Sequence, residues 1–461
     1  MTDKTTISII PLGCPKNDVD SELIAGAFKK AGYAVTWDTI KGETVVINTC
    51  GFIKEAIDES LDAILQSIKA KKAGLVKKVV VTGCLAQRFG DKLAAQLGDV
   101  DLFVGVSGFE HIPELLGRSG RHAAIPELPR TSYPEKLKRV PYRGRNSVYL
   151  KISDGCNNRC SYCVIPFIKG GLTSRNQQDI VAEARALARA GAVELNLIAQ
   201  DTMNYGSDRG HRGLTQLLEA LEAIDGIRWI RLHYLYPSHI TDEFLSFVAH
   251  STKIVHYFDM PIQHASGSIL KRMNRSTQPD DLRKTIDKIV RHIRAPFLRT
   301  TVIVGFPGET EDDFGMLLRF FDDHPFHRIG VFPYSSEQPA PASRFHDQVP
   351  AAVITERLNR MNERAQTIMH GLSQAFIDKT YDALIEGNDP SDPSVVLARP
   401  WFFAPEIDGY IMIYDAAVPA GGPFRKVRIT DSVGVDFTGE FTEQKKKPSK
   451  EVAHAKHRRS R

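Results

Sequence analysis

The stretch Gly155-Cys156-Asn157-Asn158-Arg159-Cys160-Ser161-Tyr162-Cys163 decides how the rest of the chain is interpreted. It places three thiols close together, directly after an apolar run, residues 148–153, that has the length of a buried strand. In a parallel α/β barrel, the loops that follow the strands carry the functional groups. The three cysteines are therefore expected where such a fold binds its ligands.

The spacing of these cysteines favours an iron-sulfur cluster. Three thiolates can hold three corners of a cubane cluster and leave one iron open for reaction. The alternative is structural zinc, which usually takes four protein ligands, and no fourth Cys or His lies nearby in the sequence. The C-x-x-x-C-x-x-C pattern, with Tyr162 before the last Cys, resembles the signature of the radical S-adenosylmethionine (SAM) superfamily. The resemblance implies that the open iron holds SAM and that an electron cleaves it to a 5′-deoxyadenosyl radical.

The region around this stretch predicts a barrel. Six apolar runs, each followed by a helical pattern, occupy about 190 residues, which suits a partial (βα)6 TIM-type barrel better than a closed eight-fold one. The strand candidates are Val148–Ser153, Val193–Ala199, Trp229–Tyr236, Tyr257–Ile262, Leu298–Val304 and Ile329–Tyr334.

The N-terminal part alternates short apolar runs with amphipathic stretches, and this α/β pattern predicts a doubly wound parallel sheet. The helical stretches are Asp20–Ala31 and Lys54–Lys69. The strand candidates are Ile7–Pro11, Thr44–Asn48, Lys78–Thr82 and Leu102–Val104.

The C-terminal part changes character after a helical segment, Ala351–Ile377. Short strand candidates follow and predict a small antiparallel β-barrel, similar to the TRAM module of RNA-modifying enzymes. They are Tyr381–Ile385, Ser394–Ala398, Gly409–Ile413 and Arg425–Ile429. We therefore expect an N-terminal domain (1–125), a linker (126–145), a radical SAM core (146–365), a helix with the TRAM-like barrel (366–442) and a basic disordered tail (443–461).

The other three cysteines each follow an N-terminal strand candidate. Cys14, Cys50 and Cys84 lie 34 to 36 residues apart, and two of them are preceded by Gly. Loops at the carboxyl ends of neighbouring parallel strands converge, so a second three-thiolate site is expected. The alternative is three unrelated buried cysteines. With both triplets assigned, no Cys remains for a disulfide.

The motifs around these cysteines resemble those of the methylthiotransferase family. They are Leu12–Asn17 with Asp20-Ser21-Glu22, Asn48–Ile53 and Gly83–Arg88. Pro15-Lys16-Asn17 is similar to the branch that modifies an aspartate of small-subunit ribosomal protein twelve, whereas the sister branch, which modifies transfer RNA, usually reads differently there. The resemblance covers about residues 5–440. It implies two 4Fe-4S clusters: one on Cys156, Cys160 and Cys163, and an auxiliary, sulfur-delivering one on Cys14, Cys50 and Cys84.

Further family matches lie at or just after the barrel strands, where polar side chains and glycines suit a nucleoside pocket. From them we expect SAM contacts by Tyr162, Gln200, Gln263 and Gly305; ordinary loop structure is the alternative, and no catalytic residue beyond the cluster ligands is assigned. The sequence departs from the family at Lys169, where Arg is usual, and at Asp18, where an apolar residue is common. Lys lacks the bidentate fork of Arg, which puts any contact made by that Arg in doubt.

Charge patterning points to the substrate. Residues 378–442 contain 11 acidic and 5 basic side chains, a net charge of −6 that repels a phosphate backbone and attracts a basic protein. The tail, 443–461, carries 8 basic and 2 acidic residues, which fits either a solvated segment or a loose contact to ribosomal RNA. The whole-chain charge of +5 hides this division.

The expected activity is hydrogen abstraction from the β-carbon of an aspartate of ribosomal protein twelve, free or in the small subunit, followed by sulfur and methyl transfer. The alternatives are a transfer RNA adenosine methylthiotransferase and a non-enzymatic iron-sulfur carrier or RNA-binding scaffold. Family resemblance implies a flavodoxin- or ferredoxin-type electron donor and iron-sulfur assembly and sulfur-donor proteins as partners. No secretory signal or apolar stretch of membrane-spanning length is visible, so we expect a cytoplasmic protein without a membrane partner.

Overall fold

The computed structural model describes residues 5–118, 120, 122–127, 133–134, 137–142, 144, 146–418 and 421–442. It divides into two units, Met1–Met369 and His370–Arg461, which are described separately. The predicted basic tail, 443–461, lies outside the described residues. No helix in the described part of the chain combines the length and apolar character needed to cross a membrane.

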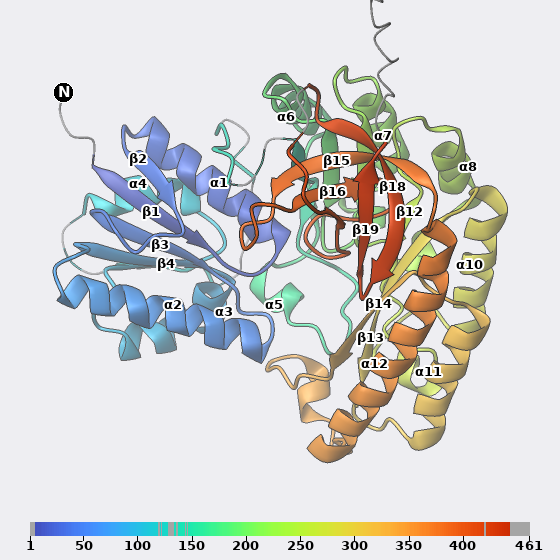
Figure 1. The fold of residues 1–461 in the computed structure, drawn as a ribbon. Coiled ribbons are helices and arrows are strands. Elements are labelled where there is room, and N and C mark those ends of the chain that lie inside the picture. Colours follow the sequence, from blue (N-terminus) through green and yellow to red (C-terminus); the bar gives the residue numbers. More distant parts are fainter. Residues whose placement is uncertain are drawn as a thin grey trace, which may run out of the picture. The chain divides into compact units, whose positions relative to one another are not determined.

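The first unit begins with a parallel sheet whose strand order is β2-β1-β3-β4-β5-β6. Figure 1 shows α2 and α3 along one face of this sheet and α1 on the other, so the doubly wound prediction is confirmed. The strands are β1 (Thr6–Pro11), β2 (Ala34–Trp37), β3 (Thr44–Thr49), β4 (Lys78–Gly83), β5 (Leu102–Val104) and β6 (His122–Ala124). The helices are α1 (Pro15–Lys30), α2 (Lys54–Lys72), α3 (Cys84–Gln96) and α4 (Ile112–Leu116).

The barrel strands form two three-stranded parallel sheets, β11-β10-β7 and β12-β13-β14. A bridge between Ile230 and Ile254 joins the halves. All six predicted strands are present: β7 (Ser147–Lys151), β10 (Glu194–Ile198), β11 (Trp229–Leu232), β12 (Tyr257–Asp259), β13 (Phe297–Val304) and β14 (Arg328–Pro333). Long helices follow them: α6 (Gln177–Arg189), α7 (Leu214–Glu222), α8 (Asp242–His250), α10 (Pro279–His292), α11 (Glu311–Asp323) and α12 (Ala351–Ser373).

Short elements connect the first barrel strand to its helix. They are β8 (Ser153–Asp154), α5 (Ile165–Ile168) and β9 (Thr173–Ser174), and α9 (Gly267–Arg272) lies later, after β12. The cysteine stretch 155–163 occupies the loop between β8 and α5. The carboxyl end of the first barrel strand therefore carries the cysteines, as the sequence predicts.

The second unit is a closed five-stranded barrel with strand order β15-β16-β17-β19-β18. β17 and β19 pair in parallel, and the other neighbours pair antiparallel. Phe403 and Phe437 stack in its core, with ring centroids 5.4 Å apart. The strands are β15 (Thr380–Asn388), β16 (Val396–Pro400), β17 (Ile411–Ile413), β18 (Phe424–Val433) and β19 (Asp436–Phe441).

Candidate cysteine sites within the first unit

Three strand ends place Cys14, Cys50 and Cys84 at one edge of the N-terminal sheet. Cys14 follows β1 and is the residue before the first turn of α1. Cys50 follows β3, and Cys84 follows β4 as the first residue of α3. Because β1, β3 and β4 are parallel neighbours, their carboxyl ends open on the same side.

Glycines allow these loops to approach one another closely. Gly13 has φ +93°, and a Cβ built there would lie 2.6 Å from the Cβ and 2.9 Å from the Sγ of Cys50. A Cβ at Gly51 would lie 2.8 Å from the Cα of Leu85. These glycines therefore let the Cys50 loop lie directly against the loops of Cys14 and Cys84.

Two buried asparagines hold the loops in this arrangement. The Asn17 side-chain amide donates to the carbonyl oxygens of Leu12 (2.9 Å) and Thr49 (3.0 Å). The Asn48 amide donates to the Asn17 carbonyl oxygen and to Ser21, each at 2.9 Å. The Cys84 thiol lies 3.9 Å from the Asn17 side-chain oxygen. Asn17, the last residue of the motif Pro15-Lys16-Asn17, therefore supports the geometry of this edge.

The thiols of this edge are free and two of them are buried. Burial, and then neighbouring charges, raise the pKa of Cys50 to about 11; burial raises that of Cys84 to about 12, with Cys50 and Cys14 contributing. With such raised pKa values the thiols are protonated near neutral pH. They become thiolate ligands only when a cationic metal centre displaces the proton. Among the described residues, no three Cys, His, Asp or Glu side chains gather tightly enough for a single metal ion. In a cubane cluster each thiolate binds a different iron, so three separate corners fit this edge better than one zinc ion.

The second triplet lies in a loop fixed by its own backbone. The Cys156 amide donates to the Gly170 carbonyl oxygen (3.2 Å), and the Cys163 amide donates to that of Cys160 (3.1 Å). Burial is the largest influence on both thiols and raises the pKa of Cys156 to about 11 and that of Cys163 to about 12. The charge of Cys160 also acts to raise the pKa of both neighbours.

Arg275 is a residue of this site that the sequence pattern did not reveal. It is 7% exposed, donates to the Pro261 carbonyl oxygen (2.6 Å), and lies 4.1 Å from the centroid of the Tyr236 ring. Its positive charge acts to lower the pKa of Cys156 and Cys163. Burial, and then the neighbouring Cys160, raise the pKa of Tyr162 well above its ordinary value. No motif spacing marks an arginine in the loop after a distant helix, so the sequence offered no signal for it.

The motif Gln200-Asp201-Thr202 ties the cysteine loop to the barrel. The Gln200 amide donates to Asp154 (2.7 Å), and Asp201 accepts from the Asn158 side chain (2.8 Å). The side-chain oxygen of Gln200 is buried without a hydrogen-bond partner in the described part of the chain. A buried, unsatisfied acceptor beside the cysteine loop fits a ligand with donor groups.

The other residues expected to contact SAM have structural tasks as well. The backbone of Gln263 bridges to β13 and has φ +71°. The Gly305 amide donates to Glu309 (2.9 Å), and a Cβ at Gly305 would lie 2.4 Å from Ile354 of α12. The need for glycine at position 305 therefore comes from helix packing.

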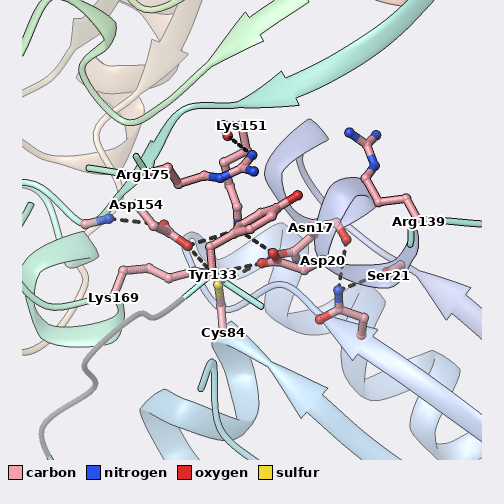
Figure 2. A network of polar contacts seen from close by, with 12 residues as sticks. Asn17, Asp20, Ser21, Cys84, Tyr133, Arg139, Lys151, Asp154, Lys169 and Arg175 are labelled. Carbon is pink, nitrogen blue, oxygen red and sulfur yellow. Dashed lines mark hydrogen bonds and ion pairs between the residues drawn. The ribbon is translucent and has the colours of Figure 1, made fainter. Parts of the chain in front are cut away.

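A buried ring of charges joins the N-terminal sheet to the barrel (Figure 2). Lys151 and Lys169 each pair with both Asp20 and Asp154. Asp20 comes from α1, whereas the other three belong to the barrel. Burial opposes ionisation of Asp154, but Lys151 and Lys169 lower its pKa below the ordinary value. Lys169, the departure from the family, therefore keeps two carboxylate contacts here.

A second network runs through the predicted linker. Arg139 donates to Glu22 of α1 and to Glu183 of α6, each at 2.7 Å. Arg175 also pairs with Glu183 (2.7 Å) and lies 3.5 Å from the centroid of the Tyr133 ring. A cavity of about 190 Å³ borders both networks, and Ser153 in its wall has a buried hydroxyl without a partner among the described residues. Asp20-Ser21-Glu22 thus contacts both networks.

Three family models match the chain. Residues 6–105 match the uncharacterized protein family UPF0004, residues 150–321 the radical SAM superfamily, and residues 377–442 the TRAM domain. The ribosomal protein uS12 methylthiotransferase RimO of Anaeromyxobacter sp. (strain K) is 41% identical over 94% of this chain and 93% of its own. That of Bdellovibrio bacteriovorus is 40% identical over 94% and 97%, respectively.

Solved structures agree on the fold. The radical SAM methyltransferase TsrM from Kitasatospora setae superposes with a TM-score of 0.53 at 16% identity, covering 71% of this chain and 74% of its own. The UPF0004 match covers the N-terminal sheet with its cysteine edge, and the radical SAM match covers the cysteine-bearing barrel. The TRAM match covers the C-terminal barrel. With relatives near 40% identity over nearly its whole length, the chain belongs to the ribosomal protein uS12 methylthiotransferase family of radical SAM enzymes.

Proposed function

We propose that this enzyme adds a methylthio group to the β-carbon of an aspartate of ribosomal protein uS12. The observation that carries the proposal is that relatives about 40% identical over nearly the whole chain are named for this reaction. The six free cysteines, which fall into two groups of three along the chain, support it. Neither an electron carrier nor an RNA-binding scaffold requires a second cysteine site joined to a barrel by a buried ring of charges.

We assign the cofactors as two 4Fe-4S clusters and SAM. Cys156, Cys160 and Cys163 hold the cluster that binds SAM, and Cys14, Cys50 and Cys84 hold the auxiliary cluster. When bound, the clusters and two SAM molecules supply the 5′-deoxyadenosyl radical, the sulfur and the methyl group that together replace one C–H bond by C–S–CH₃.

The protein's own residues position these groups and exclude water. Asp201 holds Asn158 of the cysteine loop, and Gln200 holds Asp154 while presenting its unsatisfied oxygen to a ligand. Tyr162, Gln200, Gln263 and Gly305 form the proposed SAM contacts, of which Gln200 has the strongest support. The barrel's buried lining keeps stray hydrogen donors away from a radical.

The charge of the C-terminal barrel supports a protein substrate over transfer RNA. Its 11 acidic residues exceed its 5 basic ones, so it attracts a basic ribosomal protein and repels a phosphate backbone. A ribosomal substrate also implies reaction in the cytoplasm. A flavodoxin- or ferredoxin-type donor supplies electrons, and iron-sulfur assembly and sulfur-donor proteins load and renew the clusters. The five-part division at residues 125, 145, 365 and 442 remains our proposed domain organisation.

The test of the substrate is the intact mass of small-subunit ribosomal proteins from cells with and without the gene. Loss of one methylthio group from uS12 on deletion supports the proposal. Unchanged ribosomal proteins, together with a transfer RNA that loses a methylthio-adenosine, would move the activity to transfer RNA.

The test of the cofactor assignment uses purified protein with reconstituted clusters and a strong reductant. Replacing Cys156, Cys160 or Cys163 by Ala is expected to abolish cleavage of SAM to 5′-deoxyadenosine. Replacing Cys14, Cys50 or Cys84 is expected to spare that cleavage and stop methylthio transfer. Equal loss of cleavage in both sets would contradict separate roles.

A further inference from the structure

Lys169 lies between the ring of charges and the N-terminal cysteine edge. We propose that its ammonium group is the fixed positive charge that stabilises the auxiliary site at its Cys84 corner and raises the reduction potential of the cluster held there. The proposal rests on the assignment of Cys14, Cys50 and Cys84 to that cluster. It gives a functional reason for a buried cation at position 169.

Packing places the Lys169 backbone next to Cys84. Helix α3, which begins at Cys84, packs against α5. Cys84 shares a small buried apolar cluster with Val164 and Ile168 of this segment. Lys169 directly follows Ile168 and ends α5. In Figure 2, Cys84 lies below the ring, on the side reached by Lys169, and Lys151 enters the ring from above.

Two carboxylates fix the charge and position of the ammonium group. The Lys169 Nζ lies 3.2 Å from Asp20 Oδ2 and 3.3 Å from Asp154 Oδ2, and its side chain is only 4% exposed. A buried ammonium group needs such partners to stay charged. Because Asp20 comes from α1 of the N-terminal part and Asp154 from the barrel, both parts hold the ammonium group.

The ring is neutral as a whole, so its effect on Cys84 depends on where each charge lies. Lys169 is the ring member whose backbone adjoins the buried apolar cluster that contains Cys84, and in Figure 2 its side chain enters the ring from that side. In a site shielded from water, a charge at short range is poorly screened.

Reduction of a cluster adds one electron and therefore one negative charge to the site. A fixed cation beside one of its thiolates favours the reduced state, and removing that cation lowers the reduction potential. The other lysine of the ring, Lys151, has the same two carboxylate partners and the same 4% side-chain exposure. It is therefore a matched control for loss of a ring contact without loss of Lys169.

The experiment uses the full chain with Cys156, Cys160 and Cys163 replaced by Ala, so that only the N-terminal site binds a cluster. Iron content is measured first, and the midpoint potential is then determined by redox titration followed by electron paramagnetic resonance. We expect Lys169→Gln, which keeps a hydrogen-bond donor, to disfavour reduction about tenfold, a shift of about 59 mV to lower potential. Lys169→Arg, which keeps the charge, is expected to stay near the parent value.

Lys151→Gln decides between a local charge effect and general loosening of the ring. A shift confined to Lys169→Gln and rescued by Lys169→Arg supports the proposal. Equal shifts in Lys169→Gln and Lys151→Gln, or no shift in either, overturn it while the cluster assignment stands. Absence of iron from the parent overturns the cluster assignment itself and the proposal with it.

Discussion

At the residue scale, the N-terminal cysteine edge depends on a missing side chain. Gly13 directly precedes Cys14, and its hydrogen atom occupies the space where a methyl group would meet Cys50. Two features require glycine at this position: a positive φ, which disfavours L side chains, and close contact with the neighbouring loop. At Gly32 only the first of these features is present.

Gly13→Ala is expected to impair assembly of the auxiliary site because a Cβ there lies 2.6 Å from the Cys50 Cβ. Gly32 has the same φ of +93° and nothing within 4 Å of a built Cβ, so Gly32→Ala imposes the backbone strain alone. Both variants should lose roughly 1 to 2 kcal/mol from that strain. Iron content, measured in the chain lacking the barrel cysteines, should fall at least twofold in Gly13→Ala only; a similar fall in both variants would refute the steric explanation.

The positions of the six cysteines could be expected from the sequence because a simple rule places them. Strand ends are visible as breaks in apolar runs, and parallel neighbours bring their ends together. Arg275 and Lys169 follow no such rule. Arg275 lies more than 100 residues after the cysteine loop, and Asp20, one of the two carboxylate partners of Lys169, lies 149 residues before it in the chain. Long-range charge pairing leaves no local pattern, so the sequence showed Lys169 only as a departure from the family.

At the element scale, the predicted linker does more than connect two domains. Arg139 is 5% exposed at its side chain and pairs with Glu22, from α1, and with Glu183, from α6. Burial tends to raise the pKa of Glu183, but Arg139 and Arg175 hold it below its ordinary value. The described part of the linker therefore supplies a charge that both neighbouring elements require.

Arg139→Met is expected to destabilise the first unit by about 3 to 5 kcal/mol, because it leaves two buried carboxylates with one arginine fewer. Arg364→Met removes an ion pair with Asp322 in which both side chains are 42% exposed, and its expected cost is about 0 to 1 kcal/mol. Urea unfolding of the two variants beside the parent measures the difference. Equal midpoints would show that the linker contact contributes little.

His327, directly before β14, predicts a pH dependence of stability. Its ring stacks on Phe297 with centroids 4.6 Å apart, and its Nδ1 accepts a hydrogen bond from the Leu298 amide (3.2 Å). Burial, and then the charge of Arg328, lower its pKa from 6.5 to about 4. Between pH 6.5 and pH 4, His327 therefore binds a proton in the unfolded chain but stays neutral in the folded chain.

The stability contributed by neutral His327 is complete above pH 6.5 and is lost as the pH falls toward 4. The free energy of unfolding should drop by about 3 kcal/mol over this window. His327→Gln should flatten that dependence, whereas the exposed His250 of α8 serves as the control in His250→Gln. Urea titrations at a series of pH values measure both slopes, and parallel curves for His327→Gln and the parent would contradict the assignment.

Some strands could not be predicted from the sequence because they are short or because exposed residues interrupt the apolar pattern of a buried strand. β6 is three residues long and β2 is four, and neither has a fully apolar run. β19 contains Gly439, which breaks the alternation but is required because its Cβ would lie 2.6 Å from Ile411. All six strands of the barrel, in contrast, were predicted, although β11 and β12 end at Leu232 and Asp259, earlier than expected.

At the scale of the whole molecule, opposite charges are separated along the chain. The overall charge is +5, yet residues 378–442 alone carry −6. An acidic module accelerates encounter with a basic partner and has little effect on the chemical step once the partner is bound. The acidic barrel should therefore influence KM for a basic ribosomal protein and leave kcat unchanged.

The exposed aspartates of this barrel allow that expectation to be tested without disturbing its turns. Asp392, Asp415 and Asp431 are exposed, and Asn preserves their shape, their turn hydrogen bonds and their tolerance of positive φ. The triple Asp→Asn variant should raise KM for uS12 about threefold to tenfold at low salt with kcat unchanged, and high salt should remove the difference. Asp58, Asp62 and Asp91, exposed on α2 and α3, provide a triple Asp→Asn control with the same change in charge. If the control raises KM equally, net charge alone steers the substrate; if neither does, the acidic barrel does not guide it, and recognition depends on contacts that salt does not screen.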